Sequence, residues 1–172
     1  MSGKQNPKIK PPFDLQTRLD QIGLTHIDVV LTERFLLPPA ALRKIGESVP
    51  ETIAEIAALS GMDPSEVMST LQECLDLSRD LEIEIDSLST EAAAEGTVVL
   101  DMRPDIEIDS EPLHESARLF HAQNPQQLLP FLRTQSRIFV LSHSAEHAWS
   151  AALSLRKHGI KAWLPKIAKN TH

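Results

Sequence analysis

Residues 137–165 contain the sequence feature that most restricts how this chain can fold. Four consecutive apolar residues at 138–141 predict a buried strand. A polar loop then leads into an amphipathic helix over 145–158, which stops at Gly159 before another short apolar run at 160–164. A strand, a helix and a strand in this order predict a parallel sheet and an α/β fold. In such folds ligands usually bind at the carboxyl ends of the strands, beside a helix N-terminus.

The predicted helix has recognisable ends and one buried side. Ser144 is the expected N-cap, Glu146 lies in the first turn, and Arg156 and Lys157 lie in the last turn, as the helix dipole favours. Three side chains on one side of the helix are predicted to face the sheet: Trp149, Ala152 and Leu153.

Charge is distributed unevenly along the 172 residues. Residues 1–95 contain 8 Lys and Arg against 17 Asp and Glu, whereas residues 96–172 contain 9 against 7. This asymmetry predicts two modules with different partners. The acidic first module is poorly suited to nucleic acid, because affinity for phosphate backbones comes largely from Lys and Arg.

A single cysteine, Cys74, excludes an internal disulfide and favours a reducing compartment. Residues 1–12 are polar and contain no apolar core of a signal peptide, and no apolar run approaches the length of a membrane span. We therefore expect a cytoplasmic protein that does not bind membranes. Cys74 itself falls in an apolar helical stripe between Glu73 and Asp76, which predicts a buried structural side chain and no reactive thiol.

Composition and the positions of Gly and Pro predict five segments in chain order. They are a flexible tail over 1–13, a helical module over 14–86, a linker over 87–96, an α/β domain over 97–166 and a loose tail over 167–172. Within the helical module we expect helices over about 14–23, 38–46, 52–60 and 63–77, a strand at 26–31 and a half-exposed edge strand at 81–86. Ser48 and Glu51 have the spacing of a capping box before the third helix.

Residues 38–78 resemble a helix-turn-helix and, more specifically, the helicase-and-RNase-D C-terminal domain. The resemblance depends on the residues at 42–45, on Val49 and Pro50, and on the segment at 56–64, where one predicted helix ends at Gly61 and the next begins. It implies contact with nucleic acid. The acidic side chains Glu66, Glu73 and Asp76 lie where a DNA-reading helix would need Arg, Lys, Asn or Gln, so we favour a protein-interaction module.

Residues 97–165 resemble the rhodanese family of sulfurtransferase domains. A buried strand at 97–100 closes on Asp101 and Arg103, as the first strand of that family commonly does, and the strand-loop-helix unit follows later. The section at 103–120 looks most similar to the short C-terminal rhodanese domain of tRNA thiouridine synthetases. The resemblance implies a small parallel sheet of about four strands. The residues themselves predict a connecting helix at 124–133, with Asn124 as its cap, and a final strand at 160–164.

The loop at 142–148 departs from the family pattern at its chemical positions. The catalytic cysteine of the family falls on Ser142, its glycine on Ala145, its later serine on Ala148, and its frequent basic residue on His147. A serine hydroxyl cannot hold a persulfide, so we predict a degenerate, non-catalytic loop comprising Ser142, His143, Ser144, Ala145, Glu146, His147 and Ala148. The expected function is a binding or regulatory module for a protein partner, without a cofactor, and the binding candidates are Asp101, Arg103, Ser142, Ser144 and His147.

The residue types of this loop also fit two other functions. Ser142 could act as a hydrolase nucleophile with His143 or His147 as base and Glu146 as the orienting carboxylate, but neighbours in one tight loop rarely meet with the required geometry. The histidines of the second module are His114, His121, His143, His147 and His158, and they raise the question of a metal. Without cysteines or suitably spaced carboxylates, solvated histidines are favoured over a zinc site.

Overall fold

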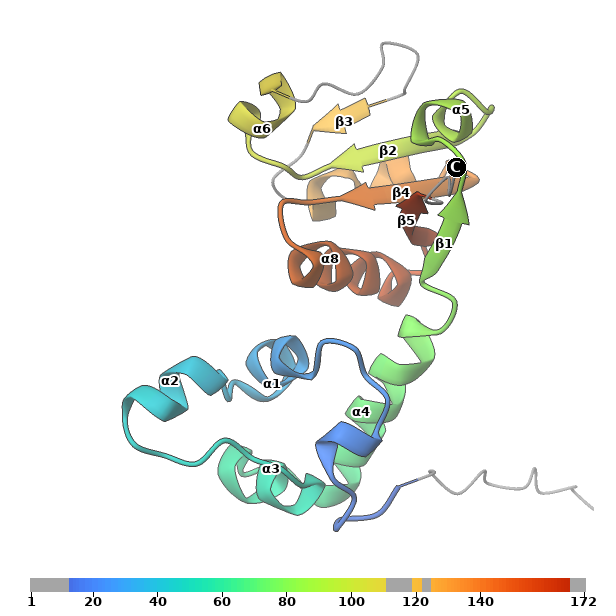
Figure 1. The fold of residues 1–172 in the computed structure, drawn as a ribbon. Helices are drawn as coiled ribbons and strands as arrows, with labels where there is room; N and C mark the ends of the chain where they lie inside the picture. The colour runs from blue at the N-terminus through green and yellow to red at the C-terminus, as the bar shows by residue number, and fades with distance from the viewer. Residues whose placement is uncertain (1–12, 111–118, 122–124, 168–172) are drawn as a thin grey trace, which may run out of the picture. The chain divides into compact units, whose positions relative to one another are not determined.

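The structure is a computed structural model that describes residues 13–110, 119–121 and 125–167. Most of the two predicted tails, residues 1–12 and 168–172, lies outside the described residues, as do His114 and the expected cap Asn124. The inner ends of both tails are ordered, contrary to the prediction: Phe13 is buried, and Ile167 ends the strand Ala162–Ile167. The chain divides into two compact units, Met1–Asp76 and Leu77–His172 (Figure 1). The division thus falls earlier than the boundary at residue 86 that we predicted, because the strand at 82–85 pairs with the sheet of the second unit.

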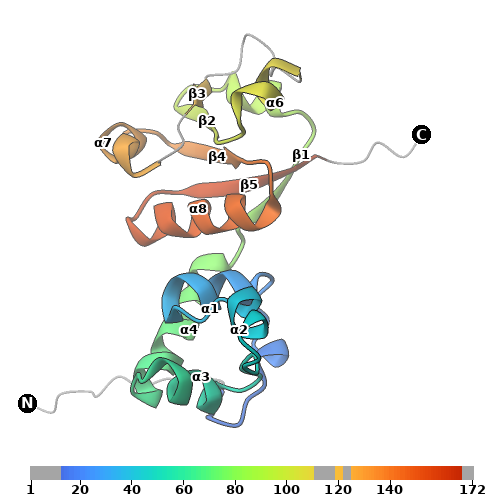
Figure 2. The same cartoon turned by 90° about the vertical axis from the view of Figure 1, so that its left-hand side faces the viewer.

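The first unit is helical in the residues that the structure describes (Figure 2). It contains a 3-10 turn, η1 (Leu19–Gln21), and four helices: α1 (Ile27–Phe35), α2 (Pro39–Lys44), α3 (Ile53–Ser60) and α4 (Pro64–Ser78), of which α4 extends into the second unit. The core of this unit takes side chains from every one of these elements, among them Leu19, Val30, Leu31, Phe35, Pro39, Ile53, Ile56, Val67 and Leu71. Cys74 is fully buried on α4, as predicted.

The predicted strand at 26–31 is wrong, because α1 begins at Ile27 and His26 precedes it as the N-cap. Val30, Leu31 and Phe35 are the buried residues of this helix, and they lie on one helical face. A strand in this unit would need a neighbouring strand to satisfy its backbone groups, whereas a helix satisfies most of them internally. The β-branched residues of this segment therefore did not decide its conformation.

The capping box before α3 also lies one turn later than we predicted. Thr52, and not Ser48, is the N-cap: its side chain accepts the Glu55 N–H at 3.3 Å, and the Glu55 carboxylate accepts the Thr52 N–H at 3.3 Å. Glu51 donates its backbone N–H to the same carboxylate at 2.6 Å. An isolated bridge between Arg18 and Thr52 holds the residues before α3 in extended form, which sets where the helix can begin.

The second unit contains a five-stranded parallel sheet with the order β1-β5-β4-β2-β3, so the α/β fold is as predicted with one strand more than expected. The strands are β1 (Glu82–Ile85), β2 (Thr97–Asp101), β3 (Leu119–His121), β4 (Arg137–Leu141) and β5 (Ala162–Ile167). The helices are α5 (Leu88–Ala92), α6 (Asp105–Ser110), α7 (Leu129–Leu132), which follows the 3-10 turn η2 (Pro125–Leu128), and α8 (Ala145–Lys157).

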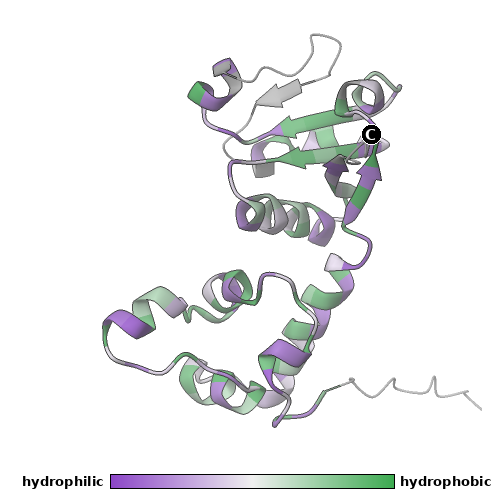
Figure 3. Ribbon diagram, in the orientation of Figure 1, coloured by the Kyte–Doolittle hydropathy of each residue, from purple (hydrophilic) through white to green (hydrophobic). Residues whose placement is uncertain are grey.

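The central strands β2 and β4 are the most apolar part of this unit (Figure 3). Successive side chains of a strand point to opposite faces of the sheet. One face forms a cluster with α5 that includes Ile85, Leu88, Ala92, Val99 and Phe139. The alternate residues of β2 and β4 face the opposite side, where α8 packs on β4 and β5 and buries Trp149, Ala152 and Leu153, as predicted.

The segment at 87–96, predicted as a linker, contains α5. Leu88 and Ala92 are buried in the sheet core, and Glu91 forms an ion pair with Arg137 at the start of β4. A segment rich in Ala, Ser and Glu has the composition of a linker, but two apolar residues at a spacing of four are enough to attach one turn of helix to a sheet. Among the described helices, none has the length and apolar content to cross a membrane.

Candidate functional site at the carboxyl edge of the sheet

The candidate site lies where β2 and β4 end side by side (Figure 1). The two strands are parallel, and Asp101 at the end of β2 lies opposite Leu141 at the end of β4. The Met102 N–H donates to the Leu141 carbonyl at 2.9 Å, which continues the pairing beyond β2. The structure therefore brings the Asp101 to Arg103 turn and the loop that begins at Ser142 to one edge of the sheet.

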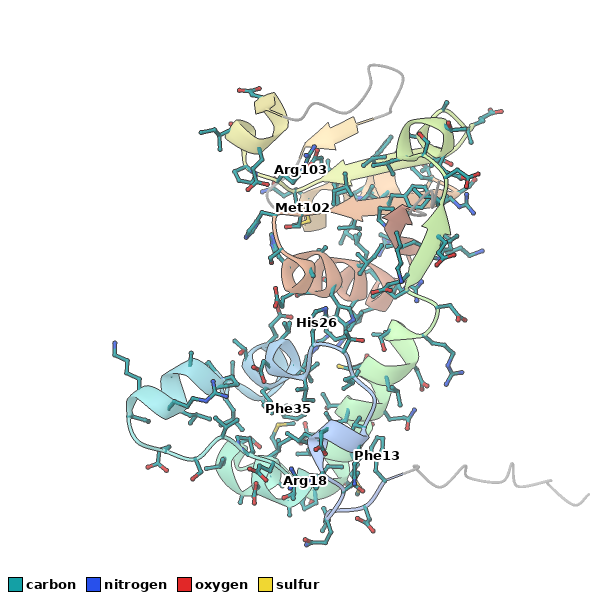
Figure 4. The ribbon with its side chains drawn as sticks, viewed as in Figure 1. Phe13, Arg18, His26, Phe35, Met102 and Arg103 are labelled. Atoms are coloured by element: carbon teal, nitrogen blue, oxygen red, sulfur yellow. The ribbon has the colours of Figure 1, made fainter. Side chains whose placement is uncertain are left out.

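Asp101 and Arg103 form a nearly buried ion pair. Asp101 is 1% exposed. Arg103 Nε lies 3.0 and 3.2 Å from its two carboxylate oxygens, and Arg103 Nη2 lies 2.7 Å from Oδ2. The backbone N–H of Arg103 also donates to Oδ1 at 3.1 Å. The guanidinium is thus folded back on its own turn after β2, where Figure 4 labels it beside Met102. The pair fixes the shape of this edge.

The Ser142 hydroxyl contacts both neighbouring histidines. Its Oγ lies 2.6 Å from His147 Nδ1 and 3.3 Å from His143 Nδ1. The two imidazole rings have centroids 5.2 Å apart and are tilted by 50°. We expected such loop neighbours not to meet. They do meet, because the first turn of α8 brings the His147 ring back over the strand end.

Ser144 caps α8 as predicted. Its Oγ accepts the His147 N–H at 3.1 Å, and its carbonyl accepts the Ala148 N–H at 3.0 Å. These two amides are therefore already used within the helix start. Ala145 and Glu146 are exposed, whereas Ala148 is buried. Glu146 lies in the first turn of α8, and in the described part of the chain no carboxylate is hydrogen-bonded to either histidine of the loop.

The histidines considered for a metal site are not gathered in one place. His143 and His147 share the loop, whereas His158 follows the other end of α8 and its Nδ1 lies 2.8 Å from the Ser154 carbonyl. His121 is in β3 and His114 lies outside the described residues. Within the described ranges, no group of three or more His, Cys, Asp and Glu side chains could hold a metal ion.

Sequence reasoning named the residues of this edge but missed one contact within it and one set of contacts at the other end of α8. The contact between Ser142 and His147 has no signal in the sequence beyond their spacing of five. Arg156, near the end of α8, was noted only for its favourable position in the helix dipole, yet its guanidinium donates to four backbone carbonyls. Comparisons of the chain with protein-family models, with curated proteins and with solved structures found no match, so the site is interpreted from its own geometry.

Proposed function

We propose that the second unit carries a rhodanese-like domain that has lost sulfur transfer and serves as a binding or regulatory module for a protein partner in sulfur handling. One observation carries this proposal: the residue that follows β4 is Ser142, and its hydroxyl is hydrogen-bonded to His147 at 2.6 Å. The Asp101 and Arg103 pair beside it supports the resemblance, because both features of the pattern lie at the same sheet edge.

Sulfur transfer requires a thiolate that attacks a sulfane sulfur and holds it as a persulfide. A serine hydroxyl has a far higher pKa than a thiol, and it forms no stable oxygen counterpart of the persulfide. The only cysteine of the sequence is Cys74, which is fully buried in the helical unit. No exposed thiol is therefore available to replace the one that Ser142 lacks.

The loop still has exposed side chains that a protein partner could contact. His143, Ala145 and Glu146 are exposed at the carboxyl edge of the sheet, and the ion pair of Asp101 with Arg103 holds the neighbouring turn in place. Loops on a rigid scaffold commonly carry recognition. We place the interaction in the cytoplasm, since the lone buried cysteine favours a reducing compartment.

Loss of sulfur transfer is tested directly with thiosulfate as donor and cyanide as acceptor. We expect the full chain to form no thiocyanate above the background of the uncatalysed reaction, because it offers no accessible thiolate. The measurement is the colorimetric rate with iron(III). Thiocyanate formation that disappears in the Ser142→Ala variant would contradict the proposal, since it would assign sulfur transfer to the loop.

Recognition by the loop is tested by site-specific photo-crosslinking in cells. A benzophenone amino acid is introduced at Ala145, which is exposed in the loop, and in a matched variant at Glu95, which is exposed before β2. We expect a defined crosslinked protein with the probe at residue 145 and none with the probe at residue 95. Identical crosslinking patterns from the two positions would mean that the loop does not select a partner.

A second candidate function is ester hydrolysis, which the short distance between Ser142 and His147 favours. In this reaction Ser142 Oγ attacks an ester carbonyl while His147 Nδ1 takes the hydroxyl proton. The alcohol leaves with that proton, and water then cleaves the acyl-serine with His147 again as base. No orienting carboxylate for His147 lies among the described residues, so any rate enhancement would be small.

A fluorophosphonate probe decides between the two candidates. The non-catalytic module is expected to remain unlabelled, as measured by intact mass. If hydrolysis is the function, one adduct forms on Ser142 and is lost in both the Ser142→Ala and the His147→Ala variants. Replacement of the exposed Ser136 by alanine is the control, and labelling there would be unaffected.

A further inference from the structure

The helical unit has a groove that belongs to neither candidate function. Its volume is about 440 Å³, and it lies between the segment at 47–51 and α3. Val49, Pro50, Ala58 and Leu59 supply its apolar lining. All of these residues belong to the first unit, so the groove is a property of that unit alone.

Within the apolar lining of the groove, Pro50 is buried and Val49 half-buried, but the side chains from α3 are not part of the core of this unit. Ile53, Ile56 and Ala57 are the residues of α3 that are buried, whereas Ala58 is exposed and Leu59 is 45% exposed. Ile45, shortly before the groove segment, is 72% exposed. Apolar side chains gathered at a groove and left in water are typical of surfaces that bind another molecule.

Three glutamates line the same groove: Glu47, Glu51 and Glu55. Glu51 pairs with Arg18 at 3.0 Å, but both side chains are largely exposed, and Glu55 uses one carboxylate oxygen in the capping box. Residues 13–76 contain 11 Asp and Glu against 4 Lys and Arg, so the surrounding surface is strongly negative. This field attracts a cationic partner and repels both nucleic acid and a second copy of the chain.

We propose that this groove docks a basic peptide segment of another protein, with an apolar side chain of the peptide on Leu59 and Lys or Arg side chains beside Glu47 and Glu51. The apolar lining supplies most of the affinity, and the glutamates select the charge of the peptide and speed its association. The inference is independent of the function proposed for the Ser142 loop. A different occupant would be the chain's own residues 1–12, which contain three lysines.

The test is a selection of a random peptide library displayed on phage against the full chain, with the double variant Glu47→Lys, Leu59→Ser used to remove non-specific binders. We expect the enriched peptides to combine Lys or Arg with Leu, Ile, Val or Pro. The most enriched peptide is then synthesised with a fluorophore, and its binding is measured by anisotropy. Added salt should weaken binding, because the glutamates lie at the protein surface.

Single variants test whether the selected peptide binds in the groove. Glu47→Lys and Leu59→Ser are each expected to weaken binding about tenfold or more. Similar changes in the other unit are the matched controls: Glu95→Lys and Ile106→Ser at exposed positions should leave binding unchanged. Circular dichroism of each variant confirms that the helices remain folded, and the two groove variants provide independent readouts if one of them unfolds.

Three results would overturn the proposal. The first is the absence of enrichment, or the enrichment of acidic peptides. The second is equal weakening by the groove variants and by their controls. The third is an increase in affinity of about tenfold when residues 1–12 are deleted, which would show that the chain's own N-terminal segment occupies the groove.

Discussion

Replacement of Asp101 by alanine is expected to destabilise the second unit by about 3 kcal/mol, because it removes a nearly buried carboxylate that accepts four hydrogen bonds from Arg103. The Asp101 side chain is 2% exposed and that of Arg103 is 14% exposed. Three hydrogen bonds from the Arg103 side chain and one from its backbone converge on this carboxylate. Removal of one partner of such a pair costs far more than the intact pair contributes.

Urea unfolding followed by tryptophan fluorescence measures this loss in the relevant unit, since the two tryptophans of the sequence, Trp149 and Trp163, both lie in the second unit. Asp109→Ala is the matched control, because Asp109 is exposed on α6, and it should change stability by less than about 0.5 kcal/mol. A loss below about 1 kcal/mol for Asp101→Ala would show that the hydrogen bonds to the Asp101 carboxylate contribute little to the stability of this unit.

Replacement of Arg156 by methionine is expected to cost about 2–3 kcal/mol in the same unit, since each net hydrogen bond from a charged donor contributes on the order of 1 kcal/mol. Its Nε donates to the Ala162 carbonyl at 2.8 Å. Its two Nη atoms donate to the carbonyls of Leu77, Arg79 and Asp80 at 2.6–3.0 Å. The side chain thereby joins the end of α8, the start of β5 and the residues that precede β1.

Arg156 is partly buried and lies close to one acidic and one aromatic residue. Burial lowers the pKa of Arg156 from its ordinary value, and the attraction of Asp80 offsets part of this effect. The guanidinium also lies over the Trp163 ring, 6.0 Å from its centroid, so the tryptophan signal is a direct probe of the contact.

Arg156→Lys is the decisive variant for the second prediction. Lysine keeps the charge but lacks the planar fork of donors, so we expect this variant to lose most of the stability that Arg156→Met loses. Arg133→Met, at an exposed position after α7, is the matched control and should be nearly neutral. If Arg156→Lys is as stable as the unchanged chain, the positive charge alone, and not the set of hydrogen bonds to carbonyls, connects α8 to β5 and to the residues before β1.

Most elements of the fold were predictable because their signals are local. The run at 138–141 and the helix after it became β4 and α8, and Ser144 became the N-cap. The stripe on α4 buries Val67, Leu71 and Cys74. Periodicity and caps are encoded within one helix or strand, so they can be read without knowledge of any partner.

The errors arose where a distant segment decides the outcome. Residues 27–31 of the predicted strand form a helix in a unit whose described part contains no sheet. The segment at 82–85 has the alternation of apolar and acidic residues that predicts an edge strand, and it is the edge strand β1. Only its pairing with β5 assigns it to the second unit. The cap before α3 is set by a bridge to Arg18.

The sequence by itself determined the α/β class, the strand-loop-helix at 137–157 and the absence of a thiol from the loop, since each follows from residue types and their spacing along the chain. Only the tertiary structure decided that Asp101 and Arg103 lie beside this loop, that Ser142 contacts His147, and that Arg156 secures the residues before β1. These contacts depend on which strands are neighbours and on how far a helix turn brings a side chain back. Both follow from packing and hydrogen bonding between segments that are distant in the sequence.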